Sequence, residues 1–290
     1  MASKLSFGDV QLSGSLPPTQ GNYWFVDSVN GSNGNSGLKP ERAVATIAKA
    51  IALAAAGDTI VALPGHTEAV TAAGTIAVSK AGLTIVSAGF GRRRAVITYT
   101  TAVGASVNVT AANVSFIGVV FAAIGFDNIT AAVNVSAADC AFIDCEFELA
   151  NATNQAALGI LTTAAADRLV VKNCFFHGSA DAGTATAIRI VGGNAIRVED
   201  NRFIGNYTTT LGAIDNATTA CTNAQVVRNT IFNRTAASTK AMTFQAGSTG
   251  QIASNYMQIL SGTAPITGAA MSWVGGNYYA ATTATAGTLI

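Results

Sequence analysis

A nine-residue phrase that recurs along the chain constrains the fold of this 290-residue protein more than any other feature. Its copies end on large apolar residues, at Phe90, Phe121, Phe147, Phe175, Phe203, Phe232 and Met257. From Phe121 to Met257 the spacings are 26, 28, 28, 29 and 25 residues. Self-similarity at a period of 20 to 50 residues is typical of solenoids, in which each unit buries its apolar face against its neighbours.

The aligned copies contain columns of similar residues. Five residues before the closing residue stand apolar side chains, at Ile85, Phe116, Phe142, Val170, Val198, Val227 and Ile252. Two residues before it stand Asn173, Asn201 and Asn255, with Cys145 and Thr230 in other copies. An Asn that recurs at a bend can bind the Asn of the next coil and tolerates the left-handed conformation that a bend needs.

A second column lies in short strands that begin with Ala and an apolar residue. These strands begin at Ala132, Ala157, Ala187, Ala213, Ala241 and Ala270. Each coil therefore has at least two strands, joined by turns rich in Gly, Asn, Thr and Ala. No helical pattern separates the strands and no Leu-rich consensus is present, so the columns predict an all-β fold, a single parallel β-helix of about seven or eight coils.

The pattern divides the chain into three parts. Residues 1–22 contain Ser, Gly and Pro without a strong period and are predicted to form an extended N-terminal arm. Residues 23–64 are predicted to contain a strand, a loop and a capping helix that leads into the solenoid. Pro40 opens that helical pattern and Gly57 ends it, with Val44, Ile47, Ala48, Ile51 and Ala55 on one face. Residues 65–290 are predicted to form the parallel β-helix, whose first coil the helix would cover.

Composition argues against several classes of function. Charged residues are 11% of the chain and the net charge is +1, so no basic footprint for nucleic acid is present. No apolar stretch is long enough to cross a bilayer, and the N-terminus lacks the layout of a secretory signal. Cys140, Cys145, Cys174 and Cys221 lack metal-ligand spacing and are predicted to be buried free thiols. We predict no cofactor and no metal, and we interpret Arg92 to Arg94 as a solvated loop or a partner contact.

The N-terminal part of the chain resembles a known superfamily. The segment from Tyr23 to Gly37, the Ala-rich helix, the strand from Gly57 to Val61 and the Pro64-Gly65 turn resemble the entry into pectate-lyase-like right-handed β-helices, as they occur in phage virion proteins. The resemblance implies a right-handed solenoid. It is weak for function, because the superfamily includes polysaccharide lyases, glycoside hydrolases, tailspikes and purely structural capsid proteins. Its hydrolases use two carboxylates, and its lyases use aspartates for calcium together with a basic residue.

The strongest candidate for a catalytic group is a charged column three residues before the closing aromatic. It contains Asp144, Lys172 and Asp200, followed by Asn229. Adjacent coils would bring Asp144 and Lys172 to about 5 Å, and the two aspartates to about 9.6 Å. The lysine would keep both carboxylates ionised, so we interpret the column as a ladder of alternating charge rather than a catalytic site.

The other polar groups receive structural interpretations. Glu146 and Glu148 are predicted to form a solvated face without a basic partner on the next coil. Asp139 and Asp167 are interpreted as turn residues. His66 and His177 lie about four coils apart and are interpreted as lone loop residues.

These observations favour a non-enzymatic phage structural protein. We expect a capsid decoration protein that is anchored through its N-terminal arm, binds other virion proteins such as the major capsid protein, and assembles in the host cytoplasm. The resemblance implies a homotrimer, without nucleic acid or membrane. The alternatives are a tailspike-like polysaccharide depolymerase, for which Asp144, Lys172 and Asp200 would be the candidate residues, and a receptor-binding tail fibre component.

Overall fold

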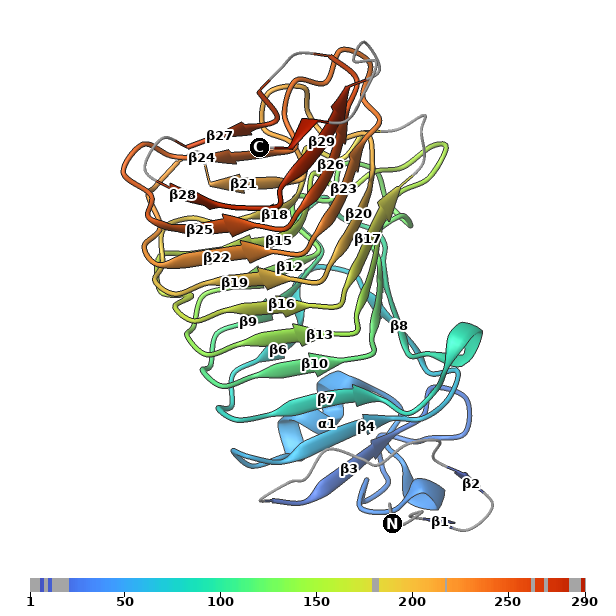
Figure 1. Cartoon of the computed structure of the whole chain (residues 1–290). Coiled ribbons are helices and arrows are strands. Elements are labelled where there is room, and N and C mark those ends of the chain that lie inside the picture. The colour runs from blue at the N-terminus through green and yellow to red at the C-terminus, as the bar shows by residue number, and fades with distance from the viewer. Residues whose placement is uncertain are drawn as a thin grey trace.

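The structure, a computed structural model, describes residues 6–7, 10–11, 21–178, 183–216, 218–261, 264–268, 271–281 and 288–289. Three parallel β-sheets wind along a common axis, with β3 near one end of the molecule and β29 near the other (Figure 1). We call them the front sheet, the side sheet and the back sheet, from their places in Figure 1. Most of the predicted N-terminal arm lies outside the described residues. Its strands β1 (Ser6–Phe7) and β2 (Val10–Gln11) pair antiparallel.

The front sheet contains ten parallel strands. They are β3 (Tyr23–Val26), β4 (Thr59–Ala62), β7 (Thr84–Ser87), β10 (Ser115–Ile117), β13 (Ala141–Ile143), β16 (Val170–Lys172), β19 (Arg197–Glu199), β22 (Ala224–Val227), β25 (Gly250–Ala253) and β28 (Met271–Val274).

The side sheet contains nine parallel strands and ends in one antiparallel strand. The parallel strands are β5 (Thr67–Val70), β8 (Val96–Tyr99), β11 (Val120–Ala122), β14 (Glu146–Ala150), β17 (Phe175–Gly178), β20 (Arg202–Gly205), β23 (Thr230–Asn233), β26 (Tyr256–Ile259) and β29 (Tyr278–Ala281). The antiparallel strand is β30 (Thr288–Leu289).

The back sheet contains eight parallel strands. They are β6 (Ala73–Val78), β9 (Ser106–Val109), β12 (Val133–Val135), β15 (Leu158–Thr162), β18 (Thr186–Arg189), β21 (Ile214–Asn216), β24 (Met242–Phe244) and β27 (Ile266–Thr267). Each coil passes from the back sheet to the front sheet, then to the side sheet, so the predicted all-β parallel β-helix of about seven or eight coils is confirmed.

Two-residue turns join front strands to side strands in six consecutive coils, from β10/β11 to β25/β26. The first turn residue has a positive φ in each of them, at Gly118, Asp144, Asn173, Asp200, Arg228 and Ser254. The second residue points inward and is buried, at Val119, Cys145, Cys174, Asn201, Asn229 and Asn255. A left-handed residue reverses the chain within two positions, which keeps the strands of successive coils in register.

Stacked phenylalanines fill the middle of the core. Phe116 stacks on Phe142 with ring centroids 5.4 Å apart. A second row of rings runs through Phe121, Phe147, Phe176 and Phe203, with successive centroids 4.7, 4.4 and 4.8 Å apart. Because parallel strands place identical positions one above another, aromatic side chains form rows along the axis.

The structure corrects the predicted alignment in two coils. Phe147 pairs in register with Phe176, and Phe203 with Ile231, so Phe175 and Phe232 lie outside the core. The inward front-sheet residues of these coils are Val171 and Val226 rather than Val170 and Val227. A one-residue slip moves a side chain to the opposite face of a strand. In both coils two adjacent apolar residues made the two registers equivalent in sequence.

The second predicted column also needs correction at two places. In the back sheet Val133 pairs with Ile160, two residues beyond the expected Leu158. Met271, expected in this column, begins β28 in the front sheet, and Ile266 takes the back-sheet position beside Met242.

A short helix closes the end of the core at β3 and β4. Helix α1 (Ile47–Leu53) contacts β3, β4 and β6 and buries Ile47, Ala50 and Ile51. The predicted capping helix is thus confirmed but shorter than the sequence pattern, because Pro40 opens only the 3-10 turn η1 (Pro40–Arg42). Helix α1 begins after Thr46, whose hydroxyl accepts the Lys49 N–H.

Candidate functional site

The predicted charged column is divided between two positions of the coil. Asp144 and Asp200 are left-handed turn residues, whereas Lys172 is the last residue of β16. Lys172 pairs in register with Ile143 and Glu199, so it does not lie between the two aspartates in one column. Asn173 and Arg228 take the turn positions that the sequence alignment assigned to Lys172 and Asn229. The predicted ladder was wrong in register for the same reason as the predicted aromatic column.

Lys172 and Asp200 instead belong to a compact ionic cluster on the outer face of the front sheet. Glu199 is its centre, buried to 5% exposure, and Arg197 Nη2 lies 2.5 Å from its Oε1. Arg228 binds Asp200 through Nε at 2.6 Å and Glu199 through Nη2 at 2.9 Å. Lys172 Nζ lies 3.9 Å from Asp200 and 4.0 Å from Glu199. We call these five residues the front-sheet cluster.

Within the front-sheet cluster, the contact between Arg228 and Asp200 favours the charged form of both side chains. The hydrogen bond from Arg228 keeps the pKa of Asp200 below its usual range, and the same contact raises the pKa of Arg228. Asp144 lies outside the cluster and accepts a hydrogen bond from the Asn173 amide. A general acid needs a pKa near the operating pH, whereas this environment moves the pKa of Asp200 the other way. The cluster is therefore suited to joining three coils and unsuited to proton transfer.

A second polar cluster lies on the outer face of the side sheet. Glu146 Oε1 lies 2.8 Å from His177 Nε2, and Glu146 Oε2 lies 2.9 Å from Arg94 Nη1. The Phe175 ring stacks on His177 at 4.6 Å, and the Arg202 guanidinium lies 5.3 Å above the same ring. We call these five residues the side-sheet cluster. Sequence reasoning missed the side-sheet cluster, because the one-residue error in register placed Cys174 and Phe176 beside the two glutamates. The structure places Phe175 and His177 there.

Glu146 is the carboxylate of the side-sheet cluster, and each of its two oxygens has a partner. Its hydrogen bond with His177 lowers its pKa, burial opposes that effect, and the Arg94 charge adds to the lowering. Arg94 also bonds the carbonyl oxygens of Gly118 and Asp144, so one guanidinium joins three coils. The expectation that Glu146 lacks a basic partner was wrong.

The two histidines agree with the sequence interpretation to different extents, because His66 lies in the loop between β4 and β5, as predicted, and His177 does not lie in a loop. His66 is 1% exposed and its Nε2 lies 3.4 Å from Glu68 Oε2. The Glu68 carboxylate accepts the backbone N–H groups of Ile47 at 2.5 Å and Ala48 at 3.2 Å, at the beginning of α1. His177 lies on β17 rather than in a loop. His66 is thus part of the N-terminal end of the core, and His177 is part of the side-sheet cluster.

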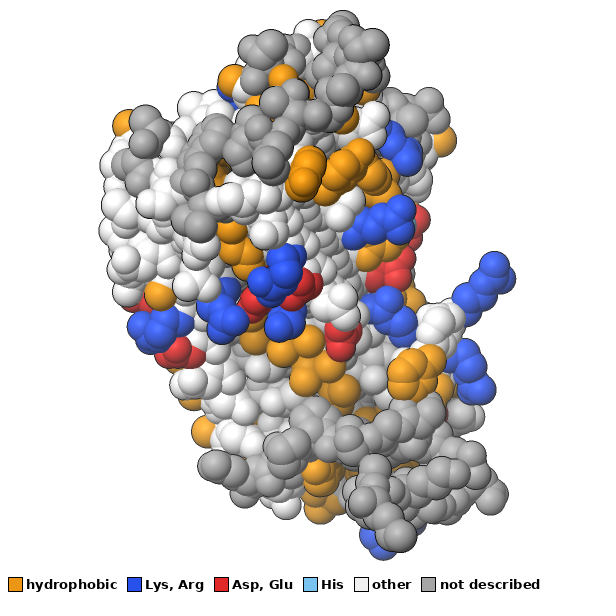
Figure 2. Space-filling model, in the orientation of Figure 1, with side chains coloured by type: hydrophobic (Ala, Val, Ile, Leu, Met, Phe, Trp, Pro, Cys, Tyr) orange, Lys and Arg blue, Asp and Glu red, His pale blue; other side chains and the backbone are white. Residues whose placement is uncertain are grey.

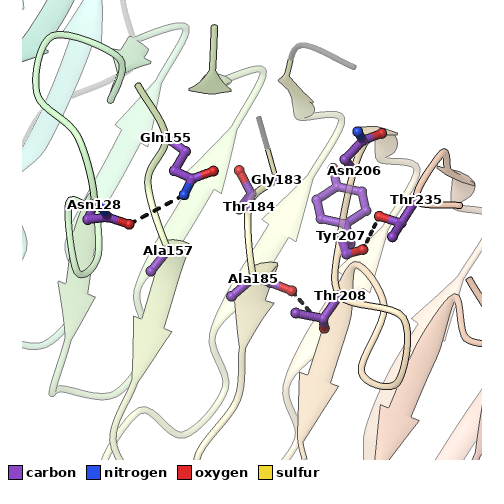
Figure 3. Close-up of a pocket in the computed structure, with 10 residues that line it drawn as sticks. All are labelled: Asn128, Gln155, Ala157, Gly183, Thr184, Ala185, Asn206, Tyr207, Thr208 and Thr235. Carbon is purple, nitrogen blue, oxygen red and sulfur yellow. Dashed lines mark hydrogen bonds between the residues drawn. The ribbon is translucent and has the colours of Figure 1, made fainter. Parts of the chain in front are cut away.

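The loops that lead from the side sheet to the back sheet line a pocket of about 400 Å³ (Figure 3). Its lining residues have amide, hydroxyl or small side chains and carry no charge: Asn128, Gln155, Ala157, Gly183, Thr184, Ala185, Asn206, Tyr207, Thr208 and Thr235. Gln155 Nε2 binds Asn128 Oδ1 at 3.3 Å, and the Thr208 hydroxyl binds the Ala185 carbonyl at 3.0 Å. These groups can hydrogen-bond a neutral polar ligand, but none of them can act as an acid or base at neutral pH.

The outer face of the back sheet carries an ion pair between β18 and β21. Arg189 Nε binds Asp215 Oδ2 at 2.7 Å, and Asp215 is 1% exposed. Along the same face, Asn134 Nδ2 binds Asn108 Oδ1 at 3.0 Å. The buried carboxylate is already neutralised by its arginine, which favours a structural role.

Within the described part of the chain, no group of three or more His, Cys, Asp and Glu side chains could hold a metal ion. The four cysteines are free and buried, as predicted. Among the described residues, no helix is long and apolar enough to cross a membrane.

Comparisons with known proteins agree with the architecture. No family model matches the chain, and the search of the curated proteins found no match. Among solved structures, the pectate lyase Pel9A is similar over 88% of this chain and 79% of its own, with a TM-score of 0.56 and 15% sequence identity. A rhamnogalacturonan lyase matches over 82% of this chain and 74% of its own, with a TM-score of 0.49 and 12% identity. The likeness to Pel9A agrees with the parallel β-helix fold of this chain.

Proposed function

We propose that this chain is a non-enzymatic structural protein. One observation carries the proposal: every described Asp and Glu except Glu41 and Glu148 is engaged in a hydrogen bond or an ion pair. The engaged carboxylates are those of Asp27, Asp58, Glu68, Asp127, Asp139, Asp144, Glu146, Asp167, Glu199, Asp200 and Asp215. Carbohydrate hydrolysis by paired carboxylates needs one group with a raised pKa. Where a carboxyl pKa departs from its usual value here, it is lowered.

Within this class we propose a phage capsid decoration protein. A rigid solenoid whose ionic clusters join successive coils suits a protein that must keep its shape on a particle surface. The exposed Arg92 and Arg93, and Phe90 at 66% exposure, form a protruding turn beside the side sheet that is suited to contact a neighbouring virion protein. The resemblance to phage solenoids supports the virion assignment. A position in the tail, as a receptor-binding fibre component, is the variant of this proposal.

The virion assignment is tested by the composition of particles. In virions purified by density gradient from the source culture, quantitative mass spectrometry should find this chain at a fixed ratio to the major capsid protein. Release by mild denaturant, with the capsid left intact, would agree with an outer decoration. Absence from purified virions would contradict the assignment, and co-purification with detached tails would favour the fibre.

The non-enzymatic assignment is tested by incubation of the protein with host surface polysaccharide. We expect no release of reducing ends or unsaturated products at any pH between 4 and 9. Activity that is lost in Asp144→Asn or Asp200→Asn, and kept in the matched surface variant Gln225→Ala, would overturn the assignment.

A polysaccharide depolymerase is the second candidate, and the side-sheet cluster is the observation that favours it. His177 is held by Glu146 and lies beside an exposed arginine and a partly exposed aromatic ring, an arrangement that can abstract a proton from a bound sugar. Under this candidate, cleavage should disappear in His177→Ala and remain in Asp200→Asn. Cleavage that is unaffected by His177→Ala would exclude the side-sheet cluster as its site.

A further inference from the structure

The outer face of the side sheet carries exposed aromatic side chains and, on its strands, two charges without an ion-pair partner in the described part of the chain. Tyr256 and Tyr278 are 45% and 50% exposed and adjacent in register, and the Phe232 ring packs edge-on against Tyr256 at 5.8 Å. In Figure 2, hydrophobic and charged side chains follow one another along the side of the molecule where the side sheet runs. Aromatic side chains of this kind are enriched in protein–protein interfaces.

The two unpaired charges are opposite in sign and lie on either side of the middle strand. Among the described residues, neither Glu148 on β14 nor Arg202 on β20 has an ion-pair partner within the chain. They are two coils apart, so about 9.6 Å separates them along the axis and they cannot reach each other. The strand between them is β17, which is also the middle strand of the nine parallel strands of the side sheet.

We propose that this face binds a second copy of the chain, with the two axes antiparallel and a two-fold axis along β17. The symmetry places β14 against β20, β11 against β23, β8 against β26 and β5 against β29. On acidic β14, Glu146 then faces Arg202 of the second copy, and Glu148, two positions along the strand, lies diagonal to that arginine. Val96 faces Tyr256 of the second copy, and Ala122 faces Phe232 of the second copy. The two Phe175 rings meet at the axis.

The antiparallel arrangement is selected by charge. In a parallel arrangement each coil would face the same coil of the second copy, so that Arg202 would meet Arg202 and the two glutamates of β14 would meet their equivalents. Like charges at such an interface are unfavourable. An isologous contact requires a surface that is complementary to itself, and the antiparallel arrangement gives acid against base and aliphatic against aromatic. The proposal is independent of the proposed virion function.

The size of the face is sufficient for such a contact. Nine strands at about 4.8 Å spacing span about 43 Å, and strands of three to five residues are about 13 Å wide. The face therefore has about 560 Å² per copy and about 1,100 Å² for the pair. A specific interface should exceed about 1,000 Å² in total. A trimer, which the phage resemblance implied, would need two different surfaces that meet head to tail, whereas this surface fits itself.

The mass of the full-length protein in solution tests the proposal. Light scattering during gel filtration, over a range of protein concentrations, should give twice the chain mass of 29.3 kDa. Arg202→Glu should raise the dimer dissociation constant more than tenfold, because it places three carboxylates together. Glu148→Arg should also weaken the dimer, and the double variant Glu148→Arg/Arg202→Glu should return the constant to within about threefold of the original value.

Two further variants of the chain provide a control and a direct test of the contact. Gln225→Glu adds a carboxylate at an exposed position of the front sheet and should leave the dimer unchanged. Phe175→Cys should form an intermolecular disulfide on mild oxidation, since the two side chains meet at the axis. Circular dichroism checks that each variant folds. A monomer at about 100 µM or a trimer would overturn the proposal. So would a dimer that Arg202→Glu does not weaken and in which Phe175→Cys forms no intermolecular disulfide.

Discussion

At the scale of single residues, two adjacent aromatic side chains point to opposite faces of a strand. Phe176 is fully buried and stacks on Phe147 and Phe203, whereas Phe175 lies on the outer face and contacts His177 and Arg202. The same division separates Ile231 from Phe232. The orientation of one side chain therefore decides whether a coil contributes an aromatic ring to the core or to the surface.

The first prediction compares Phe175 with Phe176. Phe176→Ala should lower the free energy of unfolding by about 3 to 5 kcal/mol, because it removes a ring from the middle of a row and leaves a cavity. Phe175→Ala should lower it by less than about 1 kcal/mol, because that ring is partly solvated. Urea unfolding followed by circular dichroism measures both. Equal losses for the two variants would contradict the register of β17.

Sequence reasoning could identify the columns of similar residues, but it could not decide which of two adjacent residues in the chain belongs to a column. Phe175-Phe176 offers two equivalent large residues, and the choice depends on the two-residue turn at Asn173 and Cys174, where the left-handed residue fixes which side chain points inward. Ion pairs between coils, such as Arg94 with Glu146, were beyond prediction because their partners are 52 residues apart. The candidate residues Asp144, Lys172 and Asp200 were found as charges, but their partners could not be assigned.

At the scale of elements, a ladder of buried amides joins the coils in the C-terminal half. The side chains of Asn201, Asn229, Asn255 and Asn277 are each bonded to the next at 3.0 Å. Each amide also donates to a carbonyl of the preceding coil, and each amide oxygen accepts the N–H of the preceding turn, as Asn229 does from Asn201 at 3.0 Å. The sequence predicted the column of asparagines at Asn173, Asn201 and Asn255, of which Asn173 is instead a left-handed turn residue outside the ladder. It missed Asn229 and Asn277.

The second prediction breaks this ladder in its middle. Asn229→Ala leaves the Val198 carbonyl, the Asn201 N–H and two amide side chains without their partners. Each unsatisfied buried group costs about 1 to 3 kcal/mol, so the loss should be about 3 kcal/mol or more. Thermal unfolding measures it, with Gln225→Ala on the solvated face as the control. Asn229→Asp should be at least as destabilising as Asn229→Ala at neutral pH, because it places a buried carboxylate oxygen against the Val198 carbonyl and Asn255 Oδ1.

At the N-terminal end of the solenoid, one carboxylate joins three segments of the chain. Asp58 accepts hydrogen bonds from the Asn22 N–H, the Trp24 indole N–H and the Ala55 N–H, each at 2.7 Å. It thereby joins the residue before β3, the end of α1 and the beginning of β4. Burial raises its pKa, but the bonds from Ala55, Trp24 and Asn22 lower it more, so its pKa lies below the usual value.

The third prediction follows from that lowered pKa. Because the folded state holds the ionised form, the stabilisation by Asp58 is complete above its unfolded pKa of about 3.9 and is lost as the pH falls through the lower folded value. In a Trp273→Phe background, Trp24 is the remaining tryptophan, and its fluorescence should report this transition. Asp58→Asn should remove the acid transition and lower stability by about 2 to 4 kcal/mol at neutral pH. A Trp24 signal that does not change between pH 5 and pH 2 would contradict the role of Asp58.

At the scale of the whole molecule, the coil period alone was sufficient to predict the architecture. Repetition fixes a stacked solenoid because each coil can bury its apolar residues only against the next. The third sheet could not be seen in advance, since the sequence phrase covers both the front and the side strands as one unit. Two-residue turns separate those strands in six coils, too short an interval to show as a break in the hydrophobic pattern.

The connections between sheets differ in how strictly their length is set. Front-to-side turns have two residues in six consecutive coils and three to eight in the coils at the two ends, whereas the connections from the side sheet to the back sheet range from two residues, between β5 and β6, to ten, between β11 and β12. The stack thus accommodates added chain along one edge without disturbing the rows of phenylalanine and asparagine. This edge is where a foreign peptide could be grafted and displayed, once per coil, at intervals of about 4.8 Å along a stiff rod.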